Sequence, residues 1–319
     1  MSIKQVCYSE RSEESSYWTR ETLRYAQGDI EMKILEVKKM TKLRKIFQLI
    51  EPQLVIEGAG VLLKRSISPR RSNEYDPFLL FDHFAFNDPT EGPIRGFPTH
   101  PHRGIETVTY MLEGSVRHRD SLQNQGSIGA GDVQWMTSGR GIMHEEMPQR
   151  SPDGNIYGFQ LWVNLPSHLK MSEPRYQEVS DQTIPIVEKN GAKIRLVAGT
   201  VDGVTGPVTE IAAAPLYMDV QLAPGIEWTL PVPEGHTAVA YVFEGEAVFS
   251  GETVASVMMV KYEDGDHIHV KTENSPVRFM LMAGAPFKEP IVPYGPFVMN
   301  TEEEIHQALA ELRAGTFVK

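Results

Sequence analysis

The sequence predicts an all-β protein of two tandem β-barrels with a few short helices, one of them at the C-terminus. Three observations lead to this prediction. From about residue 46, short apolar or alternating runs recur, each ended by Gly, Pro, Asn or Asp, as is typical of barrels and sandwiches. The run YMLEG at 110–114 resembles YVFEG at 241–245, and a Gly-Asp pair follows each of them. Helix signals are few. A repeated strand-turn pattern favours two small barrels over one large sandwich.

Composition limits the classes of function. The 31 basic residues against 42 acidic ones leave a net charge of −11, which disfavours direct binding of nucleic acid through its phosphates. The longest apolar runs fall short of the roughly 18 residues that a membrane span requires. Cys7 is the one cysteine, so no intrachain disulfide can form and a reducing compartment fits. We expect a cytoplasmic protein with neither a membrane nor a nucleic acid as partner.

Residues 1–45 differ from the rest of the chain. They have little apolar periodicity and lack the apolar core of a secretory signal, while several glutamates argue against an amphipathic targeting peptide. We interpret 1–45 as an N-terminal extension that is either disordered or the result of a mis-assigned start codon. Met32 and Met40 are candidates for the true first residue. A regulatory arm is the alternative interpretation.

The strands divide into two halves, which we place at 46–175 and 176–319. The runs of the first half are VLLKRSI, TVTYMLEG, DVQWM and FQLWVNL, and those of the second are IRLVAG, YMDVQL, AVAYVFEG, ASVMMV, HIHV and VRFMLMAG. The stretch 166–185 between them is polar, contains three prolines and is predicted to connect the halves.

One helix is predicted at the C-terminus. Thr301 and Glu304 form a capping box, the run IHQALAEL has helical apolar spacing, and Gly315 supplies a stop.

The run FPTHPHRGIETVTYMLEG in the first half carries the clearest chemistry. His100, His102 and Glu106 share parity, so an extended strand directs all three side chains to one face. His144 and Glu146 repeat this spacing in GDVQWMTSGRGIMHEEMP. Such residues can converge inside a barrel, where imidazole and carboxylate suit iron, manganese, nickel, copper or zinc and leave positions open for water or substrate. The sequence therefore predicts a metal site in the first barrel.

Six other histidines are predicted to have no metal-binding role. None of them stands beside a partner motif. We interpret three as solvated, namely His118, His168 and His306. The other three are interpreted as ordinary strand residues: His236, His267 and His269. Counting 131 residues on from the first motif gives Pro231, Pro233 and Thr237, which cannot replace metal ligands.

Three other residues close to the predicted site have two interpretations each. Arg140 would orient an anionic substrate or make a loop contact, and Trp135 and Met143 are expected to pack the barrel rather than touch a ligand.

Several runs together resemble a known family. HxHxxxE resembles the first cupin motif, and the chain from about residue 46 to its end is similar to the pirin family. The likeness rests on DPFLLFDHF, FPTHPHRGIETV, GDVQWMTSGRGIMHEEMP, QLWVNLP and YGPFVMNTEEEI. It implies two tandem cupin (jelly-roll) barrels with a single iron site, in the N-terminal barrel. The family's ligand positions fall on His100, His102, His144 and Glu146. Fe(2+) is the implied metal, with another divalent transition metal as the alternative.

The two acidic residues receive different roles from the resemblance. In generic cupins the glutamate of HxHxxxE is a ligand, but the pirin pattern takes its carboxylate from the second motif, here Glu146. Glu106 then becomes a buried partner that steadies a histidine or Arg103, and ligation by Glu106 is the alternative.

The resemblance also implies a function. Pirins are associated with quercetin 2,3-dioxygenase activity, which implies a flavonol-like substrate, dioxygen, and Glu146 as the catalytic base. The alternative is a non-catalytic, iron-dependent regulator that binds a transcription factor or a metabolic enzyme.

Overall fold

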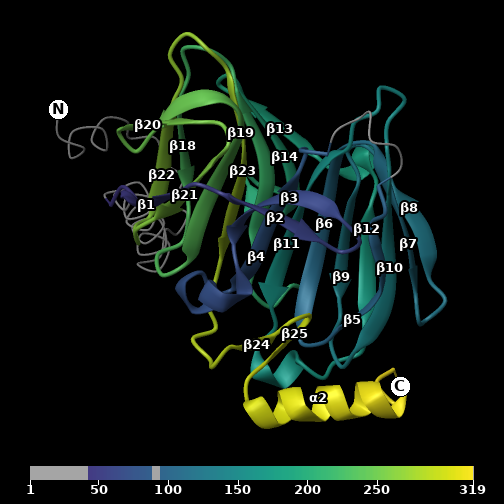
Figure 1. The fold of residues 1–319 in the computed structure, drawn as a ribbon. Helices are drawn as coiled ribbons and strands as arrows, with labels where there is room; N and C mark the ends of the chain where they lie inside the picture. The colour runs from purple at the N-terminus through teal and green to yellow at the C-terminus, as the bar shows by residue number, and fades with distance from the viewer. Residues whose placement is uncertain (1–41, 88–93, 319) are drawn as a thin grey trace, which may run out of the picture. The chain divides into compact units, whose positions relative to one another are not determined.

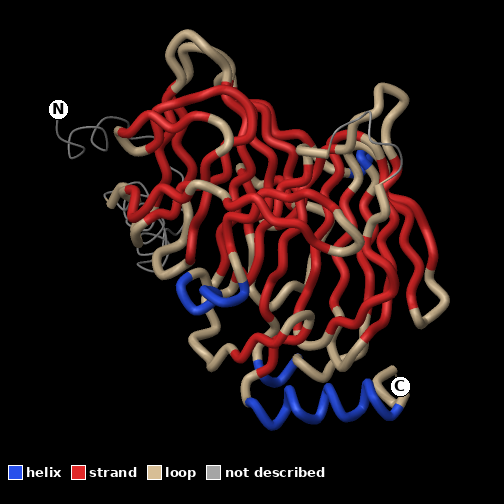
Figure 2. The backbone as a smooth tube through the Cα atoms, in the orientation of Figure 1, coloured by secondary structure: helices blue, strands red, loops and turns tan. Residues whose placement is uncertain are grey.

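The computed structural model describes residues 42–87 and 94–318, and strands form most of its regular structure (Figure 1, Figure 2). The predicted all-β fold with two tandem barrels is confirmed. Helix α2 (Glu302–Ala314) lies where the sequence predicts it. The Thr301 side chain accepts a hydrogen bond from the backbone N–H of Glu304, and Gly315 ends the helix with φ +69°. In the described part of the chain, no helix combines the length and apolarity that crossing a membrane requires.

The first barrel contains two antiparallel sheets. The seven-stranded sheet has the order β12-β9-β6-β11-β4-β3-β2, and the four-stranded sheet has the order β5-β10-β7-β8. Their strands are β2 (Gln53–Glu57), β3 (Val61–Ile67), β4 (Phe78–Phe84), β5 (Phe97–His102), β6 (Ile105–Glu113), β7 (Ser115–Asp120), β8 (Gln125–Ile128), β9 (Val133–Thr137), β10 (Ile142–Gln149), β11 (Tyr157–Asn164) and β12 (Arg175–Val179). The 3-10 helices η2 (Pro69–Glu74), η3 (Ser167–Leu169) and η4 (Asp181–Thr183) lie in connections.

The second barrel is built from one ten-stranded sheet. Its main path is β1-β21-β19-β23-β17-β14-β13, and β18, β20 and β22 branch from it. Its strands are β1 (Ile46–Ile50), β13 (Ile186–Lys189), β14 (Ala192–Ala198), β17 (Leu216–Leu222), β18 (Glu227–Pro231), β19 (Thr237–Phe249), β20 (Glu252–Ala255), β21 (Met258–Tyr262), β22 (His267–Lys271) and β23 (Val277–Gly284). Two small pairs complete the fold: β15 (Thr200–Val201) with β16 (Val204–Thr205), and β24 (Val292–Tyr294) with β25 (Phe297–Met299).

Two segments lie elsewhere than the sequence pattern places them. Strand β1, expected in the first barrel, pairs with β21 of the second. Strand β12 lies within the predicted connection and extends the first barrel's sheet by pairing with β9. Arg44, inside the predicted extension, is only 1% exposed and donates hydrogen bonds to three carbonyl groups of the second barrel. The rest of that predicted extension, residues 1–41, lies outside the described residues, and the division at 45 and 175 stays a prediction.

The internal repeat has a physical basis in two glycines with the same backbone conformation. Gly114 follows β6 with φ +76°, and Gly245, within β19, has φ +74°. Residues with side chains rarely adopt this conformation, so glycine is required at both places. In each barrel the strand that carries this glycine pairs with neighbours on both sides, which makes it a central strand.

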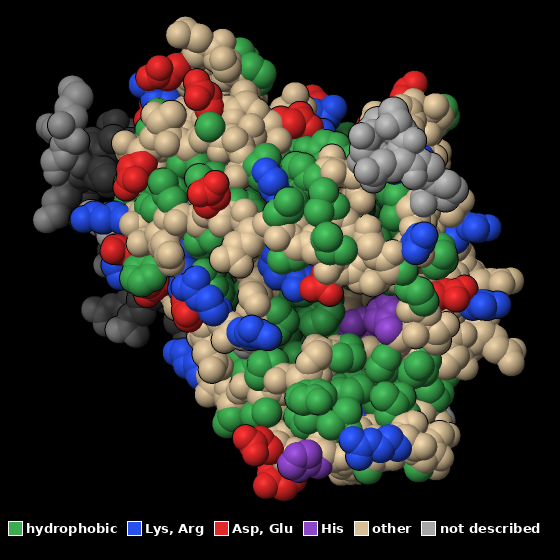
Figure 3. Space-filling view, viewed as in Figure 1, with side chains coloured by type: hydrophobic (Ala, Val, Ile, Leu, Met, Phe, Trp, Pro, Cys, Tyr) green, Lys and Arg blue, Asp and Glu red, His purple; other side chains and the backbone are tan. Residues whose placement is uncertain are grey.

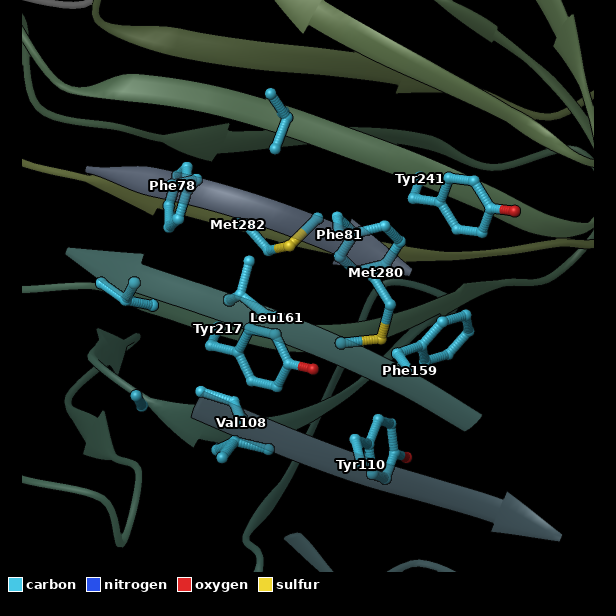
Figure 4. Packing of buried hydrophobic residues seen from close by; sticks show 14 of the residues in the cluster. Phe78, Phe81, Val108, Tyr110, Phe159, Leu161, Tyr217, Tyr241, Met280 and Met282 are labelled. Carbon is cyan, nitrogen blue, oxygen red and sulfur yellow. The ribbon is translucent and has the colours of Figure 1, made fainter. Parts of the chain in front are cut away.

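The two barrels share a hydrophobic core. Figure 4 shows aromatic residues of both barrels packed together between their sheets. The ring centroids of Phe81 and Phe159 lie 5.6 Å apart, and that of Tyr241, from the second barrel, lies 5.0 Å from Phe81. Tyr110 also donates a hydrogen bond of 2.8 Å to Asp219 across this interface. A contact this apolar fixes the two barrels against each other.

Candidate metal centre

The four predicted ligands lie on two paired strands. On β5 and β10, His100 stands opposite His144, and a bulge follows between His144 and Glu146. The side chains of His100, His102 and His144 form a cluster whose ligand atoms all lie within 4.8 Å of one another. His102 and His144 are buried, and His100 is half-buried. The structure therefore brings the three predicted histidines together.

The orientation of the histidine rings fits a cation. Nδ1 of His100 lies 2.9 Å from the carbonyl oxygen of Pro98, and Nδ1 of His102 lies 3.3 Å from that of Pro296. A ring nitrogen meets a carbonyl oxygen as a donor, so each Nδ1 carries a proton and each Nε2 of a neutral ring presents a lone pair. The two Nε2 atoms are 3.0 Å apart. Two lone pairs this close repel each other unless a cation lies between them.

His144 supports the same conclusion. Neither of its ring nitrogens has a hydrogen-bond partner among the described residues, although both are buried. A buried polar atom without a partner is costly and calls for an explanation such as an ion. Burial, followed by the neighbouring histidines, lowers the pKa of His102 and of His144 well below the ordinary value. Both rings are therefore neutral at pH 7, the form that binds metals.

Glu146 lies beside the three histidines but outside their cluster. Its Oε2 is 3.9 Å from Nε2 of His144, and its Oε1 is 3.3 Å from the hydroxyl of Thr109. Burial raises the pKa of the Glu146 carboxyl above its ordinary value, and the charge of His100 acts against this rise. Its role as a ligand stays a prediction. A carboxylate would complete a site of three imidazoles and one carboxylate, as iron and similar metals accept.

Glu106 does not point to the cluster. Strand β5 ends at His102 and β6 begins at Ile105, with Gly104 between them at φ +78°. This break ends the parity that placed Glu106 on the face of the histidines. Its Oε1 instead accepts a hydrogen bond of 2.8 Å from Thr137. Burial raises the pKa of Glu106 to about 7, although that hydrogen bond lowers it.

Arg103, one of the predicted partners of Glu106, has other contacts. Arg103 donates to the carbonyl oxygen of Arg140 and to Glu311, and its guanidinium lies 4.4 Å from the ring centre of Phe317. The expectation that Glu106 steadies a histidine or Arg103 was wrong, because the turn at Gly104 separates them.

The residues around the predicted site have structural contacts. Arg140 forms an ion pair with Glu173, which fits the loop contact. Trp135 is 1% exposed in the core, and Met143 packs near α2.

Four of the histidines predicted to have no metal-binding role are exposed or paired locally. His168 and His306 are exposed, as expected. His267 pairs with Asp266 and His269 with Glu227, so both lie in local contacts of the second barrel.

The prediction that His118 is solvated was wrong. Its side chain is 3% exposed, with Nε2 lying 3.0 Å from Glu178. On β7 the buried residues Val116 and His118 alternate with the exposed residues Arg117 and Arg119. The two arginines make this stretch look polar in sequence, so the buried face of the strand was not recognised.

A cavity of about 710 Å³ opens beside the histidines in the first barrel. His100, His102 and Glu146 line it, whereas His144 does not. Most of the other lining side chains are apolar: they include Leu63, Leu80, Phe84, Phe97, Ile156 and Trp162. Figure 3 shows histidine in purple at a hollow of the surface, above a group of hydrophobic side chains. The second barrel has a filled apolar interior of its own. The site and the cavity thus occupy the same barrel.

The sequence motifs missed residues from the far end of the chain that complete this site. Pro293, Tyr294 and Pro296, at the β24–β25 turn, line the cavity. Lys170 is 1% exposed, and its Nζ donates hydrogen bonds of 2.8–2.9 Å to Gly104, Asn164 and Val298. It thereby ties the turn after His102 to β25. The run YGPFVMN had indicated the β24–β25 turn only through the resemblance to the family. No local sequence pattern indicated a role for Lys170.

Comparison with known proteins assigns the family. The family profile described as Pirin matches residues 61–163, and that described as Pirin C-terminal cupin domain matches 217–318. A pirin-like protein of Caulobacter vibrioides is 41% identical over 276 residues, which cover 86% of this chain and 99% of that protein. The chain belongs to the pirin family. The Pirin of Homo sapiens is 42% identical over 265 residues, 81% of this chain and 88% of the human protein.

A solved structure agrees with the pirin fold of this chain. The crystal structure described as Quercetin 2,3-dioxygenase from Acinetobacter baumannii has a TM-score of 0.79 to it and 35% sequence identity. The match covers 86% of this chain and 98% of that chain. The resemblance to pirins and the bicupin fold predicted from the sequence are therefore confirmed.

Proposed function

We propose that this pirin is a dioxygenase of the quercetin 2,3-dioxygenase type that acts on flavonol-like substrates at one metal site. The proposed metal is Fe(2+), held by His100, His102, His144 and Glu146. The observation that carries the proposal is the cluster of three histidines, two of which line a cavity of about 710 Å³. The name of the Acinetobacter baumannii structure, at 35% identity, supports the reaction class.

The cavity suits a planar, largely apolar molecule. Its volume lies in the range of small-molecule sites, roughly 300–1,000 Å³. Phe97 and Trp162 stand close to the cluster, since their rings lie 6.3 Å from His100 and 5.2 Å from His102. These aromatic walls would pack on the rings of a flavonol and exclude water from its reacting carbons.

Glu146 is the proposed base. A bound divalent metal would supply a Lewis acid that lowers the pKa of the substrate hydroxyl. Glu146 would accept the proton of that hydroxyl, because burial raises its affinity for a proton. The hydroxyl of Thr109, 3.3 Å away, would orient the carboxylate. In the overall reaction dioxygen adds to carbons 2 and 4 of the flavonol, and the ring opens with loss of carbon monoxide.

We place the protein in the cytoplasm, where Fe(2+) and a single cysteine, Cys7, are kept reduced. This placement follows from the proposed metal, and its measurement is the distribution of the protein between cell fractions.

The test is oxygen uptake and carbon monoxide release by the iron-loaded protein with quercetin. We expect both in equal amounts, with loss of both in His144→Ala. His168→Ala, which changes an exposed histidine away from the site, is the matched control and should retain full activity. Iron-loaded protein that consumes no oxygen with a panel of flavonols would contradict the proposal and favour the regulatory alternative.

A further inference from the structure

Strand β2 presents an exposed aliphatic row at the edge of the seven-stranded sheet. Leu54 is 60% exposed and Ile56 is 71% exposed, the latter the highest value among the large hydrophobic residues described. Within the described part of the chain, the backbone of 53–56 forms a ladder with β3 alone. Figure 3 shows hydrophobic side chains on the same face over β2 and β3. One side of β2 therefore has backbone groups free to pair with another strand.

The edge of β2 lacks the features that protect most edge strands. It contains no lysine or proline, and its five successive pairs with β3 run without a bulge. The edge strand β1 of the other sheet also exposes apolar residues, but its register shifts between Ile46 and Gln48. Such a bulge twists an edge away from a partner. Of these two edges, β2 is the one suited to pairing.

The pattern of β2 is complementary to itself. In an antiparallel pair centred on Val55, Leu54 stands opposite Ile56 of the other strand, and Gln53 stands opposite Glu57. Apolar residues thus meet apolar ones, an amide meets a carboxylate, and no like charges face each other. We propose that β2 pairs with β2 of a second copy of this chain, forming a two-fold dimer with one sheet continuous across both molecules.

A second copy fits this edge better than another partner because the match requires a two-fold axis, which is the commonest symmetry of homo-oligomers. The pairing would also fix one wall of the cavity. The β2–β3 hairpin contributes Glu57, Gly58, Val61, Leu63 and Arg65 to the cavity lining. This inference does not depend on the proposed function, since it concerns assembly and not chemistry.

The net charge predicts how the dimer responds to salt. Each chain carries −11, so two copies repel each other at long range. Because salt screens this repulsion, the dimer should become tighter between low and physiological ionic strength.

The first test is the mass of the full chain in solution, measured by light scattering or sedimentation over a range of concentrations. We expect a dimer for the natural chain and at least a tenfold weaker association for the double variant Leu54→Lys/Ile56→Lys. Ile186→Lys is the matched control, because Ile186 is 46% exposed on β13, the edge strand of the other sheet. It should leave the dimer intact. Circular dichroism of each variant checks that it is folded.

The second test uses the two-fold register directly. In a Cys7→Ser background, Val55→Cys would place two thiols opposite each other, and a short bis-maleimide, which alkylates one thiol at each end, should join them into a covalent dimer. Leu122→Cys in the same background is the control, since Leu122 is exposed in the β7–β8 turn. A monomeric natural chain at all concentrations, a dimer unaffected by the lysine variants, or equal crosslinking of the control would each overturn the proposal.

Discussion

At the scale of single residues, two buried carboxylates take opposite roles around the same site. Glu146 lies 3.9 Å from His144 and lines the cavity, while Glu106 is held by Thr137 in the sheet. Both have raised pKa values because burial disfavours the charged form. The first is placed to meet a cation, and the second is not.

Glu146→Gln should therefore weaken iron binding by at least tenfold and remove oxygenase activity, because an amide is a poor ligand and accepts no proton. Glu106→Gln should keep the metal, since an amide oxygen can still accept the hydrogen bond from Thr137. The measurement is iron content after dialysis against a weak chelator, followed by rates at equal metal loading. If Glu106→Gln loses its iron while Glu146→Gln retains it, the ligand set is that of generic cupins.

Glu106 also predicts a pH effect on stability. Its pKa is about 7 in the folded protein and lower, about 4.5, in the unfolded chain. Between these values the folded state binds more protons, so the free energy of unfolding falls as pH rises from about 4.5 to 7. In Glu106→Gln the decrease in the free energy of unfolding over this pH range should be smaller by roughly a few kcal/mol. Urea denaturation at pH 5 and pH 7.5 measures it, and identical pH dependence in both proteins would refute the assignment.

Residue types and spacing were enough to identify the three histidines before the structure was known. The same parity argument failed for Glu106 because it assumes an unbroken strand. Gly104, with φ +78°, breaks the strand, and nothing in HPHRGIE by itself signals where the break falls. Spacing predicts a shared face only as far as the backbone stays extended.

At the scale of elements, the β24–β25 pair completes the site from nearly 200 residues away. The carbonyl oxygen of Pro296 orients His102, and that of Val298 accepts a hydrogen bond from Lys170. The contacts of Pro296 and Val298 could not be predicted from the sequence, because they depend on how the end of the chain packs against the first barrel. Helix α2, by contrast, was predictable because its capping box is local.

Lys170→Met should destabilise the protein by about 2–5 kcal/mol. The change leaves three buried acceptors, on Gly104, Asn164 and Val298, without their donor. Lys193→Met, a change at an exposed lysine of β14, is the control and should alter stability by less than about 0.5 kcal/mol. Chemical denaturation of both variants provides the comparison. Equal stability of Lys170→Met and the natural chain would show that the lysine does not hold these segments together.

At the scale of the whole molecule, two barrels with similar strand patterns differ in their interiors. The second is filled by apolar side chains, whereas the first contains the histidine cluster and a cavity. The repeat predicted two barrels, because the same run of residues, with its glycine at a positive φ, recurs at a central strand of each barrel. The repeat did not predict the core that Phe81, Phe159 and Tyr241 form between the barrels. In sequence, a strand that buries apolar residues against another barrel looks the same as one that buries them inside its own barrel.

The difference between the barrels leads to the most direct test of the metal site, which is the metal content per chain by elemental analysis after loading with Fe(2+). We expect one iron per chain in the natural protein and in the double variant His267→Ala/His269→Ala, whose histidines pair locally with Asp266 and Glu227. We expect none in His144→Ala, because removing one imidazole leaves the cluster with two. Two irons per chain, or loss of iron in the His267/His269 variant, would contradict the account.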